Sequence, residues 1–395
     1  MTATIRAATG DDLPAIHRLL LQAFSADLGR EPDPDRVTVA DDRRLVAEAD
    51  GRLVGHLGVW PLGHWLAGGC VPTGGVGAVA VDPAWRGRGV GRALLQQALA
   101  DMADRGEALA TLFPLTRGVY RHLGWEIAGE RPTWRIDTRA LAAVPADPAV
   151  ELTPATPDDV AELARLETEL APAEHGMLAR PEHFARRTLT GRDDTATYLA
   201  RRAGTLVGYV VYTHVRSNEP DALFDLRVRE LVAADGDAER TLWRLLGGHA
   251  SGARTVETTG PPTPLLELDL PAHALRPTPV TWRWMTRVVD APAAVAARGW
   301  PRNAEVELDL HLDDPRLGAN HGRWQLEVTG GTGRLVPGGT GAVHLDVGAL
   351  APLLTGWATP SQLVRAGRLR GPSDVGLADL ERALAGPTPW IRDFF

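Results

Sequence analysis

The spacing of hydrophobic positions divides the first third of the chain into short elements with clear limits. A small apolar run at residues 76–81 has the length and composition of a buried strand, and it ends at Asp82 and Pro83. Apolar residues then recur at helical spacing, at Leu94, Leu95, Ala98 and Leu99. The pattern predicts a strand, a turn rich in arginine and glycine, and a helix that begins at the glycines.

The turn between this strand and this helix has the chemistry of a phosphate site. A helix start leaves backbone N–H groups unpaired and carries partial positive charge, and glycine lets a ligand approach the backbone closely. We therefore predict that a pyrophosphate binds at the turn; a turn of this composition without a ligand is the alternative. The predicted binding residues are Arg86, Gly87, Arg88, Gly89, Val90, Gly91 and Arg92.

The middle third of the chain weakly repeats this organisation. Residues 6–13 and 153–160 both place Thr and Asp before an amphipathic run, and residues 45–57 and 199–210 both have the pattern of a hairpin with a glycine turn. In the second copy a strand at 228–233 is followed by acidic residues instead of arginines and glycines. Because like charges would repel a pyrophosphate, we expect the same fold without the cofactor; chance similarity of short hairpins is the alternative.

The last third has a different pattern, which predicts a small α+β unit. We expect alternating strands at residues 304–312, 324–328 and 341–347, a glycine-rich hairpin connection at 330–341, and helices at 291–298, 347–354, 360–366 and 375–384. The whole chain is thus predicted to be a mixed α+β protein. The expected domains are residues 1–145, 146–289 and 290–395.

The composition narrows the class of protein. The 395 residues are too many for one ordinary domain, and a net charge of −8 argues against a nucleic-acid scaffold, which is usually basic. Cys70 is the single cysteine, no apolar run approaches the length of a membrane span, and the histidines lack metal-ligand spacing. We expect a cytoplasmic protein without a signal peptide, a metal or a nucleic-acid partner.

The spacing Arg86-x-x-Gly89-x-Gly91 resembles the acetyl-CoA signature of the GNAT N-acetyltransferases. Two tandem domains of this kind, the second degenerate, followed by a small α+β domain, resemble the Eis (enhanced intracellular survival) acetyltransferases over essentially the whole chain. The resemblance implies a third domain like a sterol carrier protein, a homohexamer, and transfer of acetyl from acetyl-CoA to amines. Those amines include aminoglycosides, so the resemblance also implies antibiotic resistance.

Two local features add to the resemblance and imply the catalytic groups. The family has a tyrosine in the setting of Tyr120, after a glycine and a β-branched residue, and it ends in an aromatic residue, here Phe395, whose carboxylate enters the active site. A phenol with a pKa of about 10 suits protonation of the CoA thiolate, and a carboxylate with a pKa of about 3.3–3.7 is ionised and able to accept the amine proton, through water or after desolvation. A core tyrosine and a frayed terminus are the alternatives.

The resemblance also assigns the donor and acceptor contacts. The pantetheine arm would pair with the backbone of the strand at Ala78, Val79, Ala80 and Val81, with the N–H of Val79 or Val81 polarising the thioester carbonyl. Phe24 and Asp27 fall where the family lines its acceptor channel. Family members that accept aminoglycosides can carry an acid directly before the terminal aromatic. Here that position is Phe394, and Asp393 comes one residue earlier.

Adjacent residues on a strand point to opposite faces, so Asp393 need not replace the acid, and aminoglycoside acceptance stays open. Two other interpretations stay open as well. One is a small-metabolite N-acetyltransferase of the mycothiol-synthase type, although such enzymes usually lack a third domain. The other is a non-catalytic lipid- or CoA-binding protein, against which the intact turn at residues 86–91 argues.

Overall fold

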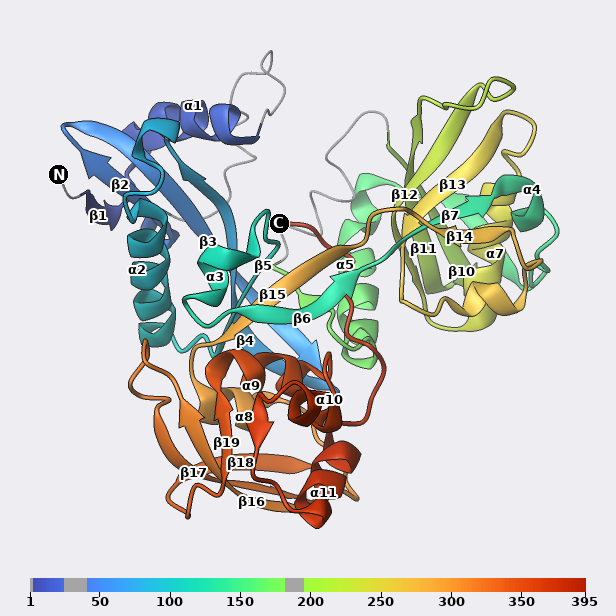
Figure 1. The fold of residues 1–395 in the computed structure, drawn as a ribbon. Coiled ribbons are helices and arrows are strands. Elements are labelled where there is room, and N and C mark those ends of the chain that lie inside the picture. The colour runs from blue at the N-terminus through green and yellow to red at the C-terminus, as the bar shows by residue number, and fades with distance from the viewer. Residues whose placement is uncertain (1–2, 25–40, 182–194) are drawn as a thin grey trace. The chain divides into compact units, whose positions relative to one another are not determined.

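The computed structural model describes residues 3–24, 41–181 and 195–395, and the chain divides into two compact units. The first unit contains residues 1–129, 283–389 and 394–395. The second contains residues 130–282 and 390–393. The last six residues, 390–395, are therefore divided between the two units (Figure 1).

A mixed sheet forms the centre of the first unit (Figure 1). Its strand order is β1 (Thr4–Ala7), β2 (Arg44–Ala49), β3 (Arg52–Leu66), β4 (Gly69–Val81), β5 (Leu109–Leu112), β15 (Trp282–Val288) and β6 (Glu126–Arg131). The accompanying helices are α1 (Leu13–Phe24), α2 (Val90–Asp104) and α3 (Arg117–Arg121).

Helix α2 packs closely on this sheet because its apolar residues share one face. Leu94, Leu95, Ala98 and Leu99, the periodic positions of the sequence, are at most 1% exposed and lie in one core with residues of β2, β3 and β4. A Cβ atom on Gly55 of β3 would come within 2.9 Å of Leu94 and Val90. The missing side chain at Gly55 therefore lets the start of α2 lie against the strand.

The second unit is built around a sheet with the order β14 (Leu275–Pro277), β7 (Thr133–Asp137), β13 (Ala253–Thr259), β12 (Phe224–Ala233), β11 (Thr205–Val215), β10 (Thr195–Arg202) and β8 (Val150–Pro154). Helices α4 (Thr138–Leu141), α5 (Val160–Leu170) and α7 (Gly236–Gly247) and the short strand β9 (Leu178–Ala179) complete it. Its core is separate from that of the first unit, with Val210, Leu226, Leu242 and Val256 fully buried.

The predicted repeat is confirmed by local structure in both units. In the first, the Asp12 carboxylate accepts a hydrogen bond from the Thr9 N–H at 2.8 Å; in the second, Asp159 accepts from the Thr156 N–H at 2.7 Å. Both thus begin their first helix with a capping box. Each predicted hairpin also forms, β2 with β3 and β10 with β11.

The structure divides the chain differently from the boundaries expected at residues 145 and 289. Strand β7 precedes residue 145 but pairs with β13 in the second unit, with Thr255 opposite Asp137. Strand β15 precedes residue 289 but pairs with β5 in the first unit, with Met285 opposite Leu112. Each repeat therefore completes its sheet with a strand from the other repeat's part of the sequence, a long-range pairing that local patterns do not encode.

The C-terminal third forms a five-stranded sheet covered by helices, within the first unit. The sheet order is β18 (Thr332–Pro337), β17 (Gly322–Thr329), β16 (Val306–Asp313), β19 (Val343–Asp346) and β20 (Leu369–Arg370), with helices α8 (Ala291–Ala297), α9 (Val347–Thr355), α10 (Pro360–Arg365) and α11 (Asp374–Leu384). The four expected helices are confirmed. The stretch 330–341, expected as a connection, contains strand β18, which pairs with β17.

A buried ion pair joins β15 to the C-terminal sheet region. Arg287 donates to both oxygens of Asp314 at 2.7 Å, and both side chains are 0% exposed.

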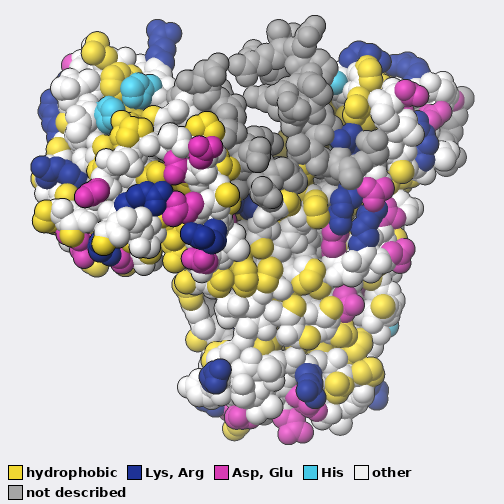
Figure 2. All heavy atoms as spheres, turned by 180° about the vertical axis from the view of Figure 1, so that it is seen from behind, with side chains coloured by type: hydrophobic (Ala, Val, Ile, Leu, Met, Phe, Trp, Pro, Cys, Tyr) yellow, Lys and Arg dark blue, Asp and Glu magenta, His cyan; other side chains and the backbone are white. Residues whose placement is uncertain are grey.

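On the face shown in Figure 2, acidic and basic side chains are interspersed rather than gathered by sign. Among the helices of the described residues, none is long and apolar enough to cross a membrane.

Candidate functional site

The turn before α2 exposes backbone donors. Gly87 and Gly89 have φ angles of +75° and +84°, the left-handed region that glycine adopts without strain. Residues 86–89 are exposed, and α2 begins after Gly89 without a side-chain cap. In the described part of the chain, the N–H groups of residues 87–89 have no hydrogen-bond partner. The turn therefore has the free donors that an anionic ligand requires.

The arginines of the turn surround these donors. Arg86 donates from Nε to the Val81 carbonyl at 3.3 Å, which leaves its other guanidinium nitrogens for a ligand. Arg88 lies over the indole ring of Trp85, 5.0 Å from the ring centre. Arg92, in the first turn of α2, is exposed. Charge and backbone donors thus occur together at this helix start.

Strand β4 leaves β5 shortly before the turn. The two strands pair in parallel only from Thr73 to Gly75. Beyond Gly75, the edge of β4 that faces β5 has no strand partner among the described residues. The predicted pantetheine-binding residues 78–81 all lie on this unpaired segment, whose backbone groups remain available to a ligand in extended conformation.

A β-bulge shapes this segment. Ala78 has a φ angle of +53°, and the pairing of β3 with β4 shifts by one residue there. The buried His56 of β3 lies with Nδ1 3.0 Å from the Ala78 carbonyl oxygen, and burial lowers its pKa to about 4. The neutral ring therefore donates to the bulge. Nothing in the spacing of the histidines indicated this role.

Tyr120 lies on α3, in the segment that follows β5. Its ring packs edge-on against Trp125, with ring centres 6.2 Å apart, and it contacts the same core as Val79 and Val81 of β4. Burial raises the pKa of the hydroxyl above its ordinary value. Among the described residues, the hydroxyl has no hydrogen-bond partner, so its proton is available to a bound molecule.

The end of the chain lies on β4. A Cβ atom built on Gly77 would be 3.3 Å from the carboxyl carbon of Phe395, and one on Gly75 would be 3.1 Å from its ring. The terminal carboxyl group is thus next to the unpaired segment of β4. Figure 1 shows the red end of the chain beside the segment after β5, where Phe113 stacks on Phe394 at 4.6 Å and meets Phe395 edge-on at 5.7 Å.

Phe113 is a site residue that the sequence did not single out. It follows β5 directly and is half-buried, as a residue at the end of an apolar strand often is. Its importance comes from the two terminal aromatics that pack on it, and these are about 280 residues away in the sequence.

Three of the four predicted acceptor residues lie in the described part of the chain. Phe24 is the last residue of α1 and is 43% exposed, while Asp27 lies outside the described residues. Phe394 is 50% exposed on Phe113. Asp393 belongs to the second unit, where its carboxylate pairs with Arg180 at 3.1 Å. The Asp393 charge is therefore compensated within that unit.

The second repeat lacks the free helix start. The Asp235 carboxylate accepts hydrogen bonds from the N–H groups of Asp237 and Ala238, at 3.1 and 2.9 Å, and pairs with Arg202. The N–H groups at the start of this helix are thus bonded by the protein's own carboxylate, whereas those of residues 87–89 are free within the described structure.

Comparison with known proteins places this geometry in a family. Acetyltransferase (GNAT) domain models match residues 4–128 and 176–288, and a sterol carrier protein domain model matches residues 291–392. A GCN5-related N-acetyltransferase from Kribbella flavida is 31% identical, with a TM-score of 0.87 over 100% of this chain and 99% of its own. N-acetyltransferase Eis of Mycobacterium tuberculosis is 28% identical over 98% of both chains. This chain belongs to the Eis-type GCN5-related N-acetyltransferases.

A second solved structure shows that the whole architecture is shared. The GCN5-related N-acetyltransferase from Anabaena variabilis superposes with a TM-score of 0.93, at 28% identity, over 100% of both chains. As a member of this family, the chain is an acetyltransferase. It has two GNAT domains and a sterol-carrier-like domain, as the sequence predicted. GNAT acetyltransferases in general use acetyl-CoA, and the free donors at residues 87–89 suit its pyrophosphate.

Proposed function

We propose that this Eis-type enzyme transfers acetyl from acetyl-CoA directly to primary amines, with Tyr120 as general acid and the Phe395 carboxylate as base. The observation that carries the proposal is the position of the terminal carboxyl group against Gly77, on the segment of β4 that has left β5. A C-terminus packed in that place is not a frayed tail. It brings a negative charge to the strand along which the donor is proposed to bind.

The donor contacts follow from the turn and the strand. The pyrophosphate accepts hydrogen bonds from the backbone of residues 86–91, with Arg86, Arg88 and Arg92 nearby. The pantetheine arm pairs with the unpaired edge of β4 from Ala78 to Val81. The N–H of Val79 or Val81 then polarises the thioester carbonyl as the tetrahedral oxyanion forms.

The proton transfers use groups whose charge states suit neutral pH. The terminal carboxylate accepts a proton from the ammonium group of the acceptor, directly or through water, and frees the nitrogen lone pair for attack. The nitrogen–carbon bond forms and the carbon–sulfur bond breaks. Tyr120, whose raised pKa keeps it protonated, donates to the departing thiolate. The acylated nitrogen loses its second proton, and uptake of one proton through water restores Tyr120.

Aminoglycosides and related polyamines are the acceptors that we propose, with Phe24, Asp27 and Phe394 along the acceptor path. The charge of Asp393 is already paired with Arg180, and Phe394 is apolar. Simple amines with an apolar portion are therefore proposed beside the polycationic ones. A homohexamer accompanies this proposal from the family resemblance, and the cytoplasmic location expected from the sequence is proposed with it.

The size of the cavity in the sterol-carrier-like domain tests the alternative of a non-catalytic lipid-binding protein. Its cavity has a volume of about 20 Å³ and is lined entirely by apolar residues, among them Trp300, Trp324 and Leu350. That volume accommodates about one water molecule. A lipid carrier needs far more space, so the packing favours a structural domain.

Release of CoA thiol from acetyl-CoA tests the proposal. The full chain is assayed with an aminoglycoside panel, spermidine, simple alkyl and aryl amines, and a lysine peptide. Acceptor-dependent release with aminoglycosides or polyamines supports the proposal. Release with a single small metabolite alone would favour the mycothiol-synthase type, and binding of acetyl-CoA without release for any amine would favour the non-catalytic interpretation.

A further inference from the structure

The second unit contains a cavity of about 180 Å³ beside the strand that corresponds to β4. Strand β12 pairs with β13 only from Phe224 to Arg227, as β4 pairs with β5 only from Thr73 to Gly75. The cavity is lined by the later part of β12 at residues 231–233, by helix α7 and by residues 390 and 392. It therefore occupies the region that corresponds to the proposed acetyl-CoA site beside β4 in the first unit.

Anionic donors do not suit this cavity. The N-terminus of α7 is capped internally by Asp235, and three carboxylates but one guanidinium line the walls, namely Glu167, Glu174, Glu239 and Arg392. Arg392 is already committed, because it donates to Glu167 at 3.0 Å and pairs with Glu230 at 3.2 Å. The excess charge of the lining is negative.

Two of these carboxylates have no basic partner. Among the residues that the structure describes, neither Glu174 nor Glu239 lies within ion-pair distance of an arginine. Each instead accepts an indole N–H, Glu239 from Trp243 and Glu174 from Trp390, both at 3.2 Å. Burial raises the pKa of Glu239, the hydrogen bond from Trp243 and the charge of Arg240 lower it, and the nearby Glu174 charge raises it. Neither carboxylate is therefore neutralised by a direct ion pair within the described structure.

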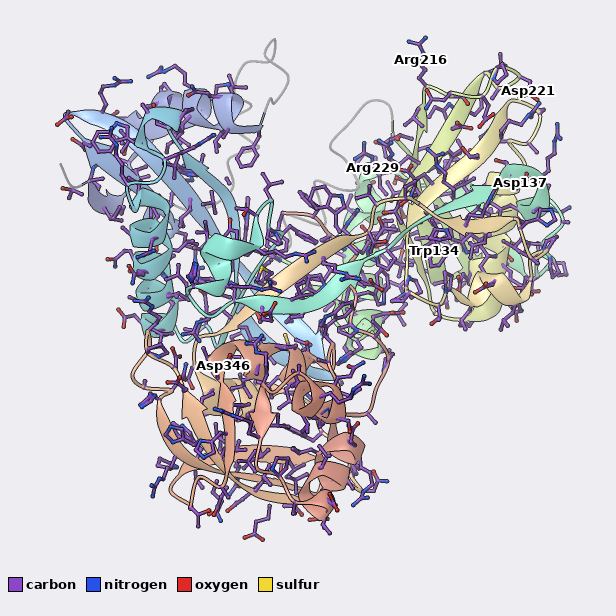
Figure 3. All side chains as sticks on the ribbon, in the orientation of Figure 1. Trp134, Asp137, Arg216, Asp221, Arg229 and Asp346 are labelled. Carbon is purple, nitrogen blue, oxygen red and sulfur yellow. The ribbon has the colours of Figure 1, made fainter. Side chains whose placement is uncertain are left out.

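Three tryptophans line the cavity together with these carboxylates. Trp134 of β7, labelled in Figure 3, Trp243 of α7 and Trp390 all line the cavity. The N–H of Trp134 is also taken, by a backbone carbonyl oxygen at 3.0 Å. Because the indole N–H groups are already bonded, the rings offer a ligand apolar surface and negative π-faces, which attract organic cations.

We propose that this cavity binds an organic ammonium ion, with its alkyl groups against Trp134, Trp243 and Trp390 and its charge near Glu174 and Glu239. The volume fits, since a cavity of about 150 Å³ holds a molecule the size of benzene. The site lies within the second unit and does not depend on the proposed acetyl transfer.

Calorimetric titration of the full chain, without acetyl-CoA and at low salt, tests the site with choline and its neutral isostere 3,3-dimethylbutan-1-ol. Choline is expected to bind at least about tenfold more tightly than the isostere, because a cation gains about 1 kcal/mol or more from each close carboxylate. Glu174→Gln and Glu239→Gln should each weaken choline binding about tenfold, while the glutamine oxygen still accepts the indole N–H.

Glu151→Gln is the matched control, since Glu151 is exposed on β8 of the same unit and does not line the cavity. It should leave choline affinity unchanged. If Glu239→Gln lowers the melting temperature, the exposed Glu174 still provides the test. Equal affinity for the isostere, no saturation at about 10 mM choline, or binding that neither glutamine variant weakens would overturn the proposal.

Discussion

At the scale of single residues, the first unit combines groups with opposite proton affinities. Burial holds Tyr120 protonated, and its hydroxyl has no hydrogen-bond partner within the described structure. The terminal carboxyl group of Phe395 has an ordinary pKa of about 3.3–3.7 and is ionised at neutral pH. A group able to donate a proton and a group able to accept one are therefore both present in this unit.

Replacing Tyr120 by phenylalanine removes the proposed acid and keeps the ring that packs on Trp125. We expect kcat to fall about 10²- to 10⁴-fold, the usual contribution of general acid catalysis, with KM for acetyl-CoA nearly unchanged. CoA release under saturating substrate measures both constants. Tyr198→Phe, in the second unit, is the control and should remain active. Wild-type kcat in Tyr120→Phe would remove this residue from the acid role.

Replacing Gly89 by alanine tests the phosphate turn. The φ angle of +84° costs alanine about 1–2 kcal/mol, although its Cβ would touch nothing within 4 Å. We expect a lower free energy of unfolding and a raised KM for acetyl-CoA, because strain displaces the donor N–H groups. Gly10→Ala is the control, since Gly10 is equally open but lacks a positive φ. Unchanged KM together with the expected destabilisation would place the pyrophosphate elsewhere.

At the scale of elements, the two repeats differ in how a helix begins after its strand. Helix α2 begins after Gly89 with no side-chain cap, whereas α7 begins after Asp235, whose carboxylate binds the first N–H groups. A helix start is positive in both cases. In the first unit that charge remains available to a ligand, and in the second it stabilises the protein's own aspartate.

Asp235→Ala should lower the free energy of unfolding by about 1 kcal/mol at neutral pH, and Asp235→Asn by less, because asparagine also caps helices. The Arg202 hydrogen bond and the backbone N–H groups lower the pKa of Asp235 to about 2. The contribution of the charge is therefore complete above the ordinary carboxyl pKa of about 3.9. It declines as the pH falls toward about 2.

The pH dependence of the Asp235 contribution is checked by urea unfolding of the wild type and both variants at a series of pH values. The difference between wild type and Asp235→Ala should be constant above about pH 5 and shrink at lower pH. A difference that grows on acidification would contradict the assigned cap.

At the scale of the whole molecule, the C-terminal segment contributes to two cores. Arg392 and Asp393 belong to the second unit, in a buried charged cluster with Arg180, Glu167 and Glu230. Burial by itself would raise the pKa of Glu230, but the charges of the two arginines hold it well below the ordinary range. The next two residues contact the first unit.

Two truncations separate the stability of this segment from its proposed catalytic role. Ending the chain at Asp393 retains the charged cluster and removes the carboxyl group from β4, so we expect a small change in melting temperature and loss of most activity. Ending it at Pro389 also removes the buried Trp390 and Arg392. Loss of one partner from a buried charge cluster costs about 3–5 kcal/mol, so the second unit should be strongly destabilised.

Thermal unfolding and CoA release measure the two effects. A chain extended by one alanine after Phe395 is the companion variant, because it keeps every side chain and moves only the carboxylate. Full activity in the extended chain or in the chain ending at Asp393 would refute the terminal base.

The sequence by itself determined what depends on neighbours along the chain. The arginine–glycine turn, the two capping boxes, both hairpins and the helices of the last third all form where their patterns lie, because caps, glycine turns and hydrophobic periods act within a few residues. The degenerate second repeat was visible as acids at the helix start. The family models confirm two GNAT domains in tandem.

Only the tertiary structure decided which distant segments meet. Strands β7 and β15 each pair in the sheet of the other repeat, and β18 forms within a stretch that has the composition of a connection. The roles of His56 and Phe113 depend on a bulge and on a chain end, and Asp393 pairs with an arginine more than two hundred residues away. Such contacts arise from packing and charge pairing across the fold, which no local pattern records.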